Sequence, residues 1–289
     1  MFSIKDYKSE IKPVFCPGCG DYGVLAAITK AFVDLQLDPD NTVIVSGIGC
    51  SSSMPHNFKC YGIHGIHGRA LPVAEGVKLA NAGLNVVVVG GDGDGYGIGL
   101  QHLVHAARRN INLTYVIMDN EIYGLTTGQA SPTSSFGHKT KSTPFGVIEK
   151  PINPITLLIA SGASYVARGF SGEPPHLAEL IKNGITHKGF SVIDVESPCV
   201  TFNKVNTFEW ARKVVYKLEG HDPKDISKAM EKAFEFEIDP SKLSIGLLYE
   251  SDRPAYEDLE RALKENKILV KHDMLNANDV LALLEEYRV

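Results

Sequence analysis

Short apolar runs alternate with amphipathic segments over the first two thirds of the chain. Apolar, strand-like runs occupy residues 42–46, 85–90, 113–118, 164–167 and 189–195. Helical periodicity of apolar positions is found in residues 22–36, 71–82, 97–109, 154–161 and 175–187. Strands that are apolar throughout and separated by helices are typical of a parallel sheet covered on both faces. The pattern therefore predicts an α/β fold with a doubly wound, mostly parallel sheet, whose ligands bind at the carboxyl ends of the strands.

The pattern changes beyond Cys199, where segments rich in Lys and Glu predominate. Helices are predicted at 207–218, 225–234, 254–264 and 276–287, with an isolated strand at 244–250. We expect residues 1–203 to form the binding domain and residues 204–289 a mainly helical extension that packs on it or on a partner subunit. The loop 122–150, rich in Gly, Ser, Thr and Pro, is predicted to be a lid or a partner contact. A disordered surface loop is the alternative for its second half.

Composition narrows the class of protein. The 289 residues are 44% hydrophobic and 22% charged, which is an ordinary globular balance. The net charge of −5 does not indicate a nucleic-acid-binding protein. No apolar run reaches the length of a membrane span. The polar N-terminal sequence MFSIKDYKSEIK lacks the apolar region of a signal peptide, so a cytoplasmic location is predicted.

An aspartate and an asparagine follow two successive predicted strands. Gly91-Asp92-Gly93 comes directly after the strand 85–90, and Asn120 follows the strand 113–118. Magnesium prefers oxygen ligands and commonly takes one or two carboxylates together with phosphate oxygens. The glycines let the backbone approach phosphates closely. The layout predicts a site for magnesium and a diphosphate, whereas a plain glycine-rich turn is the alternative for Gly-Asp-Gly taken alone.

The cysteines suggest a second metal site. Cys16 and Cys19 form a Cys-Pro-Gly-Cys turn before a predicted helix, while Cys50 and Cys199 each follow a strand. If these strands end at one edge of the sheet, four thiolates converge and suit an iron–sulfur cluster or a structural zinc ion. A redox-active pair of the thioredoxin type is a weaker alternative. Cys60 lies in a polar, basic stretch and is left out of the set, although it could replace one ligand.

A histidine-rich loop, His64 to Arg69, precedes the predicted helix 71–82. Backbone amides at a helix start attract anions, and Arg69 or a histidine adds charge-assisted contacts to a phosphate. A polar loop with solvated side chains is the alternative. A metal site of two histidines is not favoured, because the loop itself contains no carboxylate.

Taken together, these motifs resemble the beta subunit of 2-oxoacid:ferredoxin oxidoreductases. The resemblance covers about residues 12–205 and, more loosely, the remainder. The matching segments are FCPGCGDYGVL (15–25), SGIGCSS (46–52), HGIHGRALP (64–72), GGDGDGYGIGLQHLVHAARRN (90–110), MDNEIYGLTTGQASPT (118–133) and ESPCVTFN (196–203).

The resemblance implies roles for particular residues. A 4Fe–4S cluster is implied to bind Cys16, Cys19, Cys50 and Cys199. Magnesium is implied to bind Asp92, the side chain of Asn120 and the backbone carbonyl of Ile122. Thiamine diphosphate is implied to be lined by Ile48, Gly49, Cys50, Ser51, His67, Gly91, Gly93, Asp94, Gly124 and Leu125. No catalytic side chain of this chain is implied.

The implied activity is the oxidative decarboxylation of a 2-oxoacid to an acyl-CoA, with electrons passing through the cluster to ferredoxin. The glutamate that activates the aminopyrimidine of thiamine diphosphate normally belongs to a separate domain, so an alpha subunit is an expected partner. Ser53 stands where some relatives carry a basic residue linked to coenzyme A, and Thr127 where some carry a lysine. Asp119 also replaces the first residue of a common Asn-Asn pair.

2-Oxoglutarate is the favoured substrate, and pyruvate and branched 2-oxoacids are the alternatives. A non-catalytic electron-transfer subunit is the alternative function.

Overall fold

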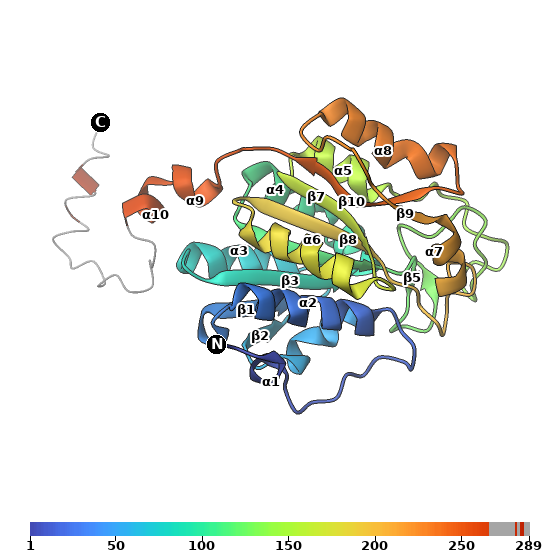
Figure 1. The fold of residues 1–289 in the computed structure, drawn as a ribbon, viewed down its shortest axis with the longest axis horizontal. Helices are drawn as coiled ribbons and strands as arrows, with labels where there is room; N and C mark the ends of the chain where they lie inside the picture. Colours follow the sequence, from blue (N-terminus) through green and yellow to red (C-terminus); the bar gives the residue numbers. More distant parts are fainter. Residues whose placement is uncertain (266–280, 282–283, 286–289) are drawn as a thin grey trace.

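One eight-stranded sheet organises the molecule (Figure 1). The computed structural model describes residues 1–265, 281, 284 and 285. The strand order is β2-β1-β3-β4-β8-β7-β10-β9, and only β10 pairs antiparallel to a neighbour, β7. The strands are β1 Thr42–Ser46, β2 Tyr61–His64, β3 Asn85–Gly91, β4 Leu113–Asp119, β7 Tyr165–Phe170, β8 Phe190–Glu196, β9 Val215–Lys217 and β10 Leu243–Glu250. The predicted doubly wound, mostly parallel sheet is confirmed.

Helices cover both faces of this sheet. On one face lie α2 Asp21–Leu35 and α6 Pro174–Thr186. On the other lie α3 Ala70–Ala80, α4 Leu100–Arg109, α5 Pro154–Ser161 and α8 Ile226–Ile238. The shorter elements are α1 Ile4–Tyr7, α7 Phe208–Val214, α9 Tyr256–Leu259, α10 Arg261–Glu265, the 3₁₀ segments η1 Pro39–Asn41 and η2 Ser51–Asn57, and the hairpin β5 Ile122–Tyr123 with β6 Gln129–Ala130.

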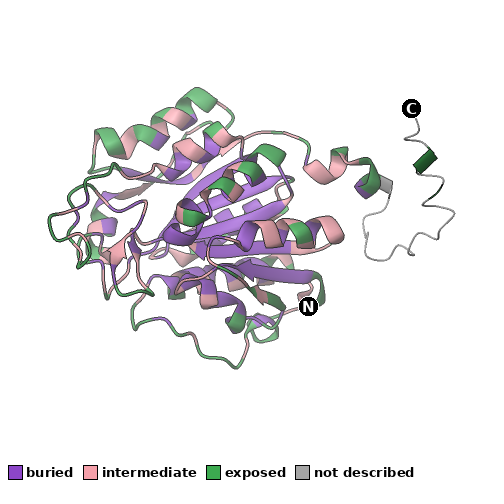
Figure 2. Ribbon diagram, turned by 180° about the vertical axis from the view of Figure 1, so that it is seen from behind, coloured by how far each residue is buried: buried purple, intermediate pink, exposed green. Residues whose placement is uncertain are grey.

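Alternate residues of each central strand supply two separate cores. Val43 and Val45 of β1 pack toward α3, whereas Ile44 packs toward α2. In β3, Val86 and Val88 face the first core and Val87 and Val89 the second. Successive strand side chains point to opposite faces, so a strand covered on both sides is apolar throughout. Figure 2 shows the resulting band of buried strands between partly exposed helices.

Several predicted elements need correction. The sequence did not predict β2, because this edge strand is mostly exposed and lacks an apolar pattern. The helix predicted at 207–218 ends at Val214, and residues 215–217 form β9, as the β-branched pair Val214-Val215 favours. The strand in 244–250 is not isolated but pairs with β7 and β9. The helix at 254–264 is broken at Glu260, whose backbone is extended.

Two further differences concern element ends. The helix predicted from Gly97 begins only at Leu100, because η3, a π-helical turn over Gly93–Ile98, precedes it and Gly97 has non-helical backbone angles. The helix predicted at 276–287 lies outside the described residues except for 281, 284 and 285. Although β9 and β10 extend the main sheet, the division at residue 203 stays a prediction.

No helix in the described part of the chain is long and apolar enough to cross a membrane. The 15 residues of α2 fall short of the ~20 that span a bilayer. The cytoplasmic location stays a prediction.

Asn110 connects three parts of the fold and should be a large contributor to stability. It ends α4 in a left-handed conformation (φ 58°). Its Oδ1 accepts hydrogen bonds from the Phe190 amide (2.9 Å) and the Ser164 hydroxyl (2.6 Å), and its Nδ2 donates to the carbonyls of Arg253 and Pro254.

We expect Asn110→Ala to lower the free energy of unfolding by about 3 kcal/mol, because buried partners are left unpaired. The half-exposed Asn112 is a matched control, and its alanine variant should differ from the wild type by less than about 0.5 kcal/mol in urea unfolding. Equal losses for the two variants would contradict this role of Asn110.

Candidate functional site

The ends of β1, β3 and β4 bring the predicted residues together at one edge of the sheet. β3 lies between β1 and β4, and all three are parallel, so the loops that follow them are neighbours. These loops, together with the loop after β2 that carries His67, line one cavity of about 200 Å³. Its lining contains Ile48, Gly49, Cys50, Ser51, His67, Gly91, Asp92, Gly93, Asp94, Asn120, Ile122, Gly124 and Leu125. These are all the residues predicted for thiamine diphosphate and magnesium, although their roles stay predictions.

Asp92 is the buried carboxylate of this cavity. It is only 1% exposed, and its Oδ2 accepts a hydrogen bond of 2.9 Å from the Thr133 hydroxyl. Burial raises the pKa of Asp92 to about 6, against the lowering effect of hydrogen bonds from Ser131, Thr133 and nearby backbone amides. A buried carboxylate is costly unless a cation compensates it. The buried Asp92 carboxylate therefore fits a divalent cation that binds against a diphosphate.

Asn120 is held by a tight turn after β4. Its Oδ1 accepts a hydrogen bond of 3.0 Å from the Ile122 amide, and Asn203 donates to its backbone carbonyl. Glu121, which lies between Asn120 and Ile122 in the chain, has a left-handed backbone conformation (φ 55°). The turn fixes the Asn120 side chain at the cavity wall and places Ile122 beside it, as the predicted ligand set requires.

Asp94 joins three loops. Its Oδ1 accepts hydrogen bonds from the amides of Ile48 (2.9 Å) and Gly68 (2.7 Å) and lies 3.0 Å from Nδ1 of His67. Its buried Oδ2 has no hydrogen-bond partner in the described part of the chain. The carboxylate thus positions the loops after β1 and before α3, which is a role that the sequence did not indicate.

Tyr123 and Thr126 also line the cavity, and neither was predicted from the sequence. The Tyr123 hydroxyl donates to the Gly93 carbonyl (3.3 Å), and its ring covers Gly93 so closely that a Cβ there would lie 2.1 Å from the ring. Gly93 is therefore required for the ring to close over the cavity. The available signal was the position of Tyr123 between two predicted residues, Ile122 and Gly124.

Arg69 does not line the cavity. Its Nη1 donates to the carbonyls of Gly68 (3.2 Å) and Ile98 (3.4 Å). The Ser53 hydroxyl donates to the carbonyl of Cys50 (2.7 Å), and Thr127 has a left-handed conformation (φ 75°) in the turn after Gly124. Arg69 is thus held by backbone carbonyls and lies outside the lining of this cavity.

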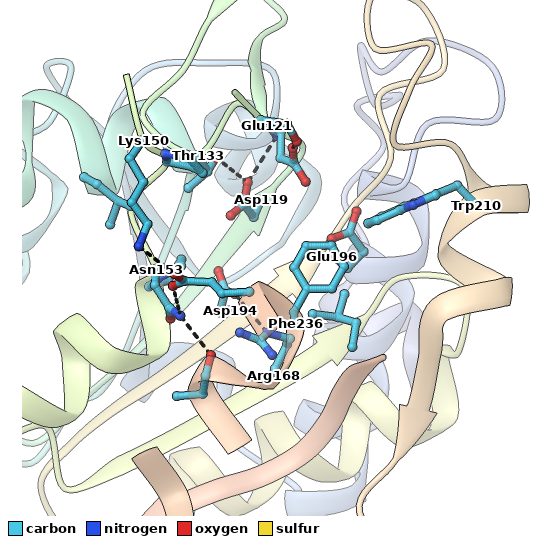
Figure 3. Close-up of a pocket in the computed structure, with 17 residues that line it drawn as sticks. Asp119, Glu121, Thr133, Lys150, Asn153, Arg168, Asp194, Glu196, Trp210 and Phe236 are labelled. Carbon is cyan, nitrogen blue, oxygen red and sulfur yellow. Dashed lines mark hydrogen bonds and ion pairs between the residues drawn. The ribbon is translucent and has the colours of Figure 1, made fainter. Parts of the chain in front are cut away.

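A second cavity lies behind the turn at Asn120 (Figure 3). Five carboxylates line it, from Asp119, Glu121, Asp194, Glu196 and Glu237. The Arg168 guanidinium lies among them, with its Nε 3.6 Å from Asp194. The Thr133 hydroxyl lies within hydrogen-bond distance of both Asp119 (2.8 Å) and Asp92 (2.9 Å), so it links the two cavities. The pKa of Asp119 is raised well above its usual range, mainly by burial and secondly by the charge of Asp92. This network positions the residue that precedes Asn120.

The four predicted cluster ligands converge beside the first cavity. A Cβ added at Gly124 would lie 3.7 Å from Sγ of Cys50 and 3.8 Å from Sγ of Cys199. Burial raises the pKa of Cys50 to about 11, and the charges of Asp21, Cys199 and Cys16 contribute. The pKa of Cys19 is raised by burial and by Asp21, Cys199 and Cys50. Cys16 and Cys199 therefore lie near Cys50, and Cys50 and Cys199 lie near Cys19.

The fifth cysteine lies apart from these four. Cys60 packs in the core beneath α2, and burial raises its pKa to about 12, which supports leaving it out of the set.

This site and the fold around it define a thiamine diphosphate-binding domain. Residues 47–195 match the family model described as "Thiamine pyrophosphate enzyme, C-terminal TPP binding domain". Residues 199–265 match the family model for the C-terminal region of the beta subunit of pyruvate ferredoxin oxidoreductase. The chain belongs to the family of 2-oxoacid:ferredoxin oxidoreductase beta subunits, which confirms the resemblance found in the sequence.

Relatives and solved structures agree with this assignment. The beta subunit of 2-oxoacid:ferredoxin oxidoreductase 1 from Aeropyrum pernix is 52% identical over 75% of this chain and 68% of its own length. The beta subunit from Saccharolobus solfataricus is 43% identical over 95% of this chain and 96% of its own. A 2-oxoglutarate:ferredoxin oxidoreductase structure from Magnetococcus marinus, with 2-oxoglutarate, coenzyme A and succinyl-CoA bound, is 43% identical, with a TM-score of 0.90 over 98% of this chain and 96% of that one.

Proposed function

We propose that this chain, together with an alpha subunit, oxidatively decarboxylates a 2-oxoacid to an acyl-CoA and carbon dioxide and passes the electrons through a 4Fe–4S cluster to ferredoxin. The observation that carries the proposal is the shared wall of the two sites. Cys50 and Gly124 line the cavity, and Gly124 also lies against the sulfurs of Cys50 and Cys199. Electrons released in the cavity thus have a short path to the four-cysteine site.

Thiamine diphosphate, when bound, supplies a carbon nucleophile and an electron sink. This chain would hold its diphosphate through magnesium, with oxygen ligands from Asp92, Asn120 and the Ile122 carbonyl. The partly exposed ring of His67, which is held by Asp94, supplies a further polar group at the wall. The Tyr123 ring lies over Gly93 at the same wall.

A 4Fe–4S cluster suits the four cysteines better than a structural zinc ion, because Cys50 and Cys199 lie beside the cavity in which the oxidation is proposed to occur. Zinc has no redox chemistry, whereas an iron–sulfur cluster accepts electrons. A non-catalytic electron-transfer subunit is disfavoured, because it would have no use for the buried Asp92 or the Asn120 turn.

The expected substrate is 2-oxoglutarate, since the solved structure with 2-oxoglutarate bound is 43% identical to this chain. Pyruvate and branched 2-oxoacids are the alternatives. The test is methyl viologen reduction by the anaerobically purified complex with coenzyme A and each of 2-oxoglutarate, pyruvate and the branched acid 3-methyl-2-oxobutanoate. A preference for 2-oxoglutarate supports the proposal. A preference for pyruvate or the branched acid overturns the choice of substrate, and no reduction with any of the three overturns the activity.

The chain is expected to be inactive without an alpha subunit. The described residues form one α/β sheet, and thiamine enzymes take the activating glutamate from a second domain of this kind. We expect the isolated chain, supplied with thiamine diphosphate, magnesium and an intact cluster, to show no 2-oxoacid-dependent reduction of methyl viologen. Addition of the alpha subunit should restore it. Turnover by the isolated chain would refute the need for a partner.

A further inference from the structure

Cys16 lies at the surface of the four-cysteine site. It is exposed, whereas Cys19, Cys50 and Cys199 are half-buried. Its position is fixed by its neighbour Phe15, which is buried and packs edge-on against Tyr22 with ring centroids 5.3 Å apart. The Tyr22 hydroxyl also donates to the Phe15 carbonyl (3.2 Å). The proposed cluster therefore reaches the surface at a rigid point.

The segment before Cys16 carries two exposed lysines, Lys8 and Lys12, exposed apolar side chains and a single exposed carboxylate after Lys8, that of Glu10. Lys12 and the 74% exposed Val14 come just before Cys16. On its other side, Lys204 Nζ donates a hydrogen bond to the Val200 carbonyl. The Val200 side chain lies close to Gly18, because a Cβ added at Gly18 would be 3.9 Å from it. Lys204 thus stands beside the Cys16–Cys19 turn.

A groove of about 270 Å³ continues this surface along α2. Lys8 and the exposed Ile11 contribute to its lining. Figure 1 shows the segment between α1 and α2 running along the outside of the molecule. Among the residues that the structure describes, Lys8, Lys12 and Lys204 take part in no ion pair. We call Lys8, Ile11, Lys12, Val14, Cys16 and Lys204 the Cys16 face.

We propose that the Cys16 face docks an acidic one-electron carrier protein of the ferredoxin type. This inference rests on the proposed function, because it needs a cluster at the four cysteines. The chain as a whole carries a net charge of −5, so an acidic carrier is repelled on average and needs a local basic surface. Complementary charge raises the rate of encounter, and the exposed apolar side chains supply the dry contact at the centre.

The size of the face suits a short-lived encounter. Complexes of redox partners are weak and bury less than about 1,200 Å² of surface in total. A small contact centred on Val14 and Ile11, with the lysines at its rim, is sufficient for such a complex. Each turnover, 2-oxoacid + CoA → acyl-CoA + CO₂ + H⁺, releases two electrons. Two oxidised carrier molecules must therefore bind and leave in succession, each taking one electron, so a weak, charge-steered interface is required.

The test reverses charge on the Cys16 face in the complete complex. The variant is Lys12→Glu with Lys204→Glu, and neither side chain lines the cavity or belongs to the cysteine set. Its matched control is Lys228→Glu with Lys242→Glu, two exposed lysines near α8. A charge-retaining variant, Lys12→Arg with Lys204→Arg, completes the series. Each complex is assayed with 2-oxoglutarate and coenzyme A, using either methyl viologen or an acidic plant-type ferredoxin as acceptor, at low and high salt.

We expect the reversed variant to raise KM for ferredoxin by about tenfold at low salt, and less at high salt, with methyl viologen reduction unchanged. The control and the arginine variant should match the wild type. Ferredoxin kinetics unchanged by Lys12→Glu with Lys204→Glu, while the wild type reduces both acceptors, would overturn the docking surface alone. A wild-type complex that reduces neither acceptor would overturn the proposed function, and the docking surface with it.

Discussion

Asp92→Ala is expected to abolish magnesium-dependent binding of thiamine diphosphate and to lower kcat by at least about 10³-fold. The reason is that a metal ion contributes several kcal/mol of stabilisation, and each 1.4 kcal/mol is a factor of ten. Binding of thiamine diphosphate is measured by calorimetry with and without magnesium, and turnover by reduction of methyl viologen in the complete complex.

The stability of the Asp92 variant distinguishes loss of a ligand from loss of the fold. The pKa of Asp92, raised to about 6 by burial, lies above its unfolded value of 3.8. The ionised side chain therefore destabilises the metal-free fold increasingly as pH rises from about 4, and fully above about 6. At pH 7 the metal-free Asp92→Ala variant should be at least as stable as the metal-free wild type. The variant does not leave the Thr133 hydroxyl unpaired, because Asp119 still accepts its hydrogen bond.

Asp40→Ala, which truncates an exposed aspartate, is the matched control and should change neither binding nor turnover. Full magnesium-dependent binding by Asp92→Ala would refute the assignment of Asp92 as a metal ligand. A collapse of stability in that variant would instead indicate a structural role.

Cys199→Ser is expected to remove the iron and the brown colour of the complex and to lower ferredoxin reduction by more than about 100-fold. Loss of groups that only orient metal ligands costs 10–100-fold in affinity or activity, and a direct ligand should cost at least as much. Iron, zinc and acid-labile sulfide are measured on the same samples, together with the visible spectrum.

Cys60→Ala is the control for this experiment, because Cys60 packs in the core beneath α2 and is not in the proposed ligand set. It should keep iron and colour. Retention of both by Cys199→Ser would contradict the assignment of Cys199. A colourless wild type with one zinc per chain would replace the cluster by a structural zinc ion.

The central strands could be predicted from the sequence because both of their faces are covered. Val43 to Val45 and Val86 to Val89 leave no polar position, since each side chain enters one of two cores. The same reasoning fails at the edges of the sheet. β2 is mostly exposed and carries no apolar signal, and β9 continues directly from a helix with no turn residue between them.

The site was predictable where it depends on strand ends. Asp92 and Asn120 follow paired parallel strands, so their meeting at one edge follows from topology. Contacts between distant loops could not be predicted in this way. Thr133 bridges Asp92 and Asp119 from a loop without regular structure, and Asp94 binds the amides of Ile48 and Gly68. Such contacts depend on the three-dimensional path of each loop, which spacing along the chain does not reveal.

The central claim is that 2-oxoacid chemistry in the cavity delivers electrons to the neighbouring cysteines. The most direct measurement is the visible spectrum of the anaerobic complex with its alpha subunit, loaded with thiamine diphosphate and magnesium. The spectrum is followed while 2-oxoglutarate and coenzyme A are added without an acceptor. Our account predicts a brown chromophore that bleaches and that regains its colour when oxidised ferredoxin is added. A chromophore that no 2-oxoacid bleaches, or a colourless complex, would contradict it.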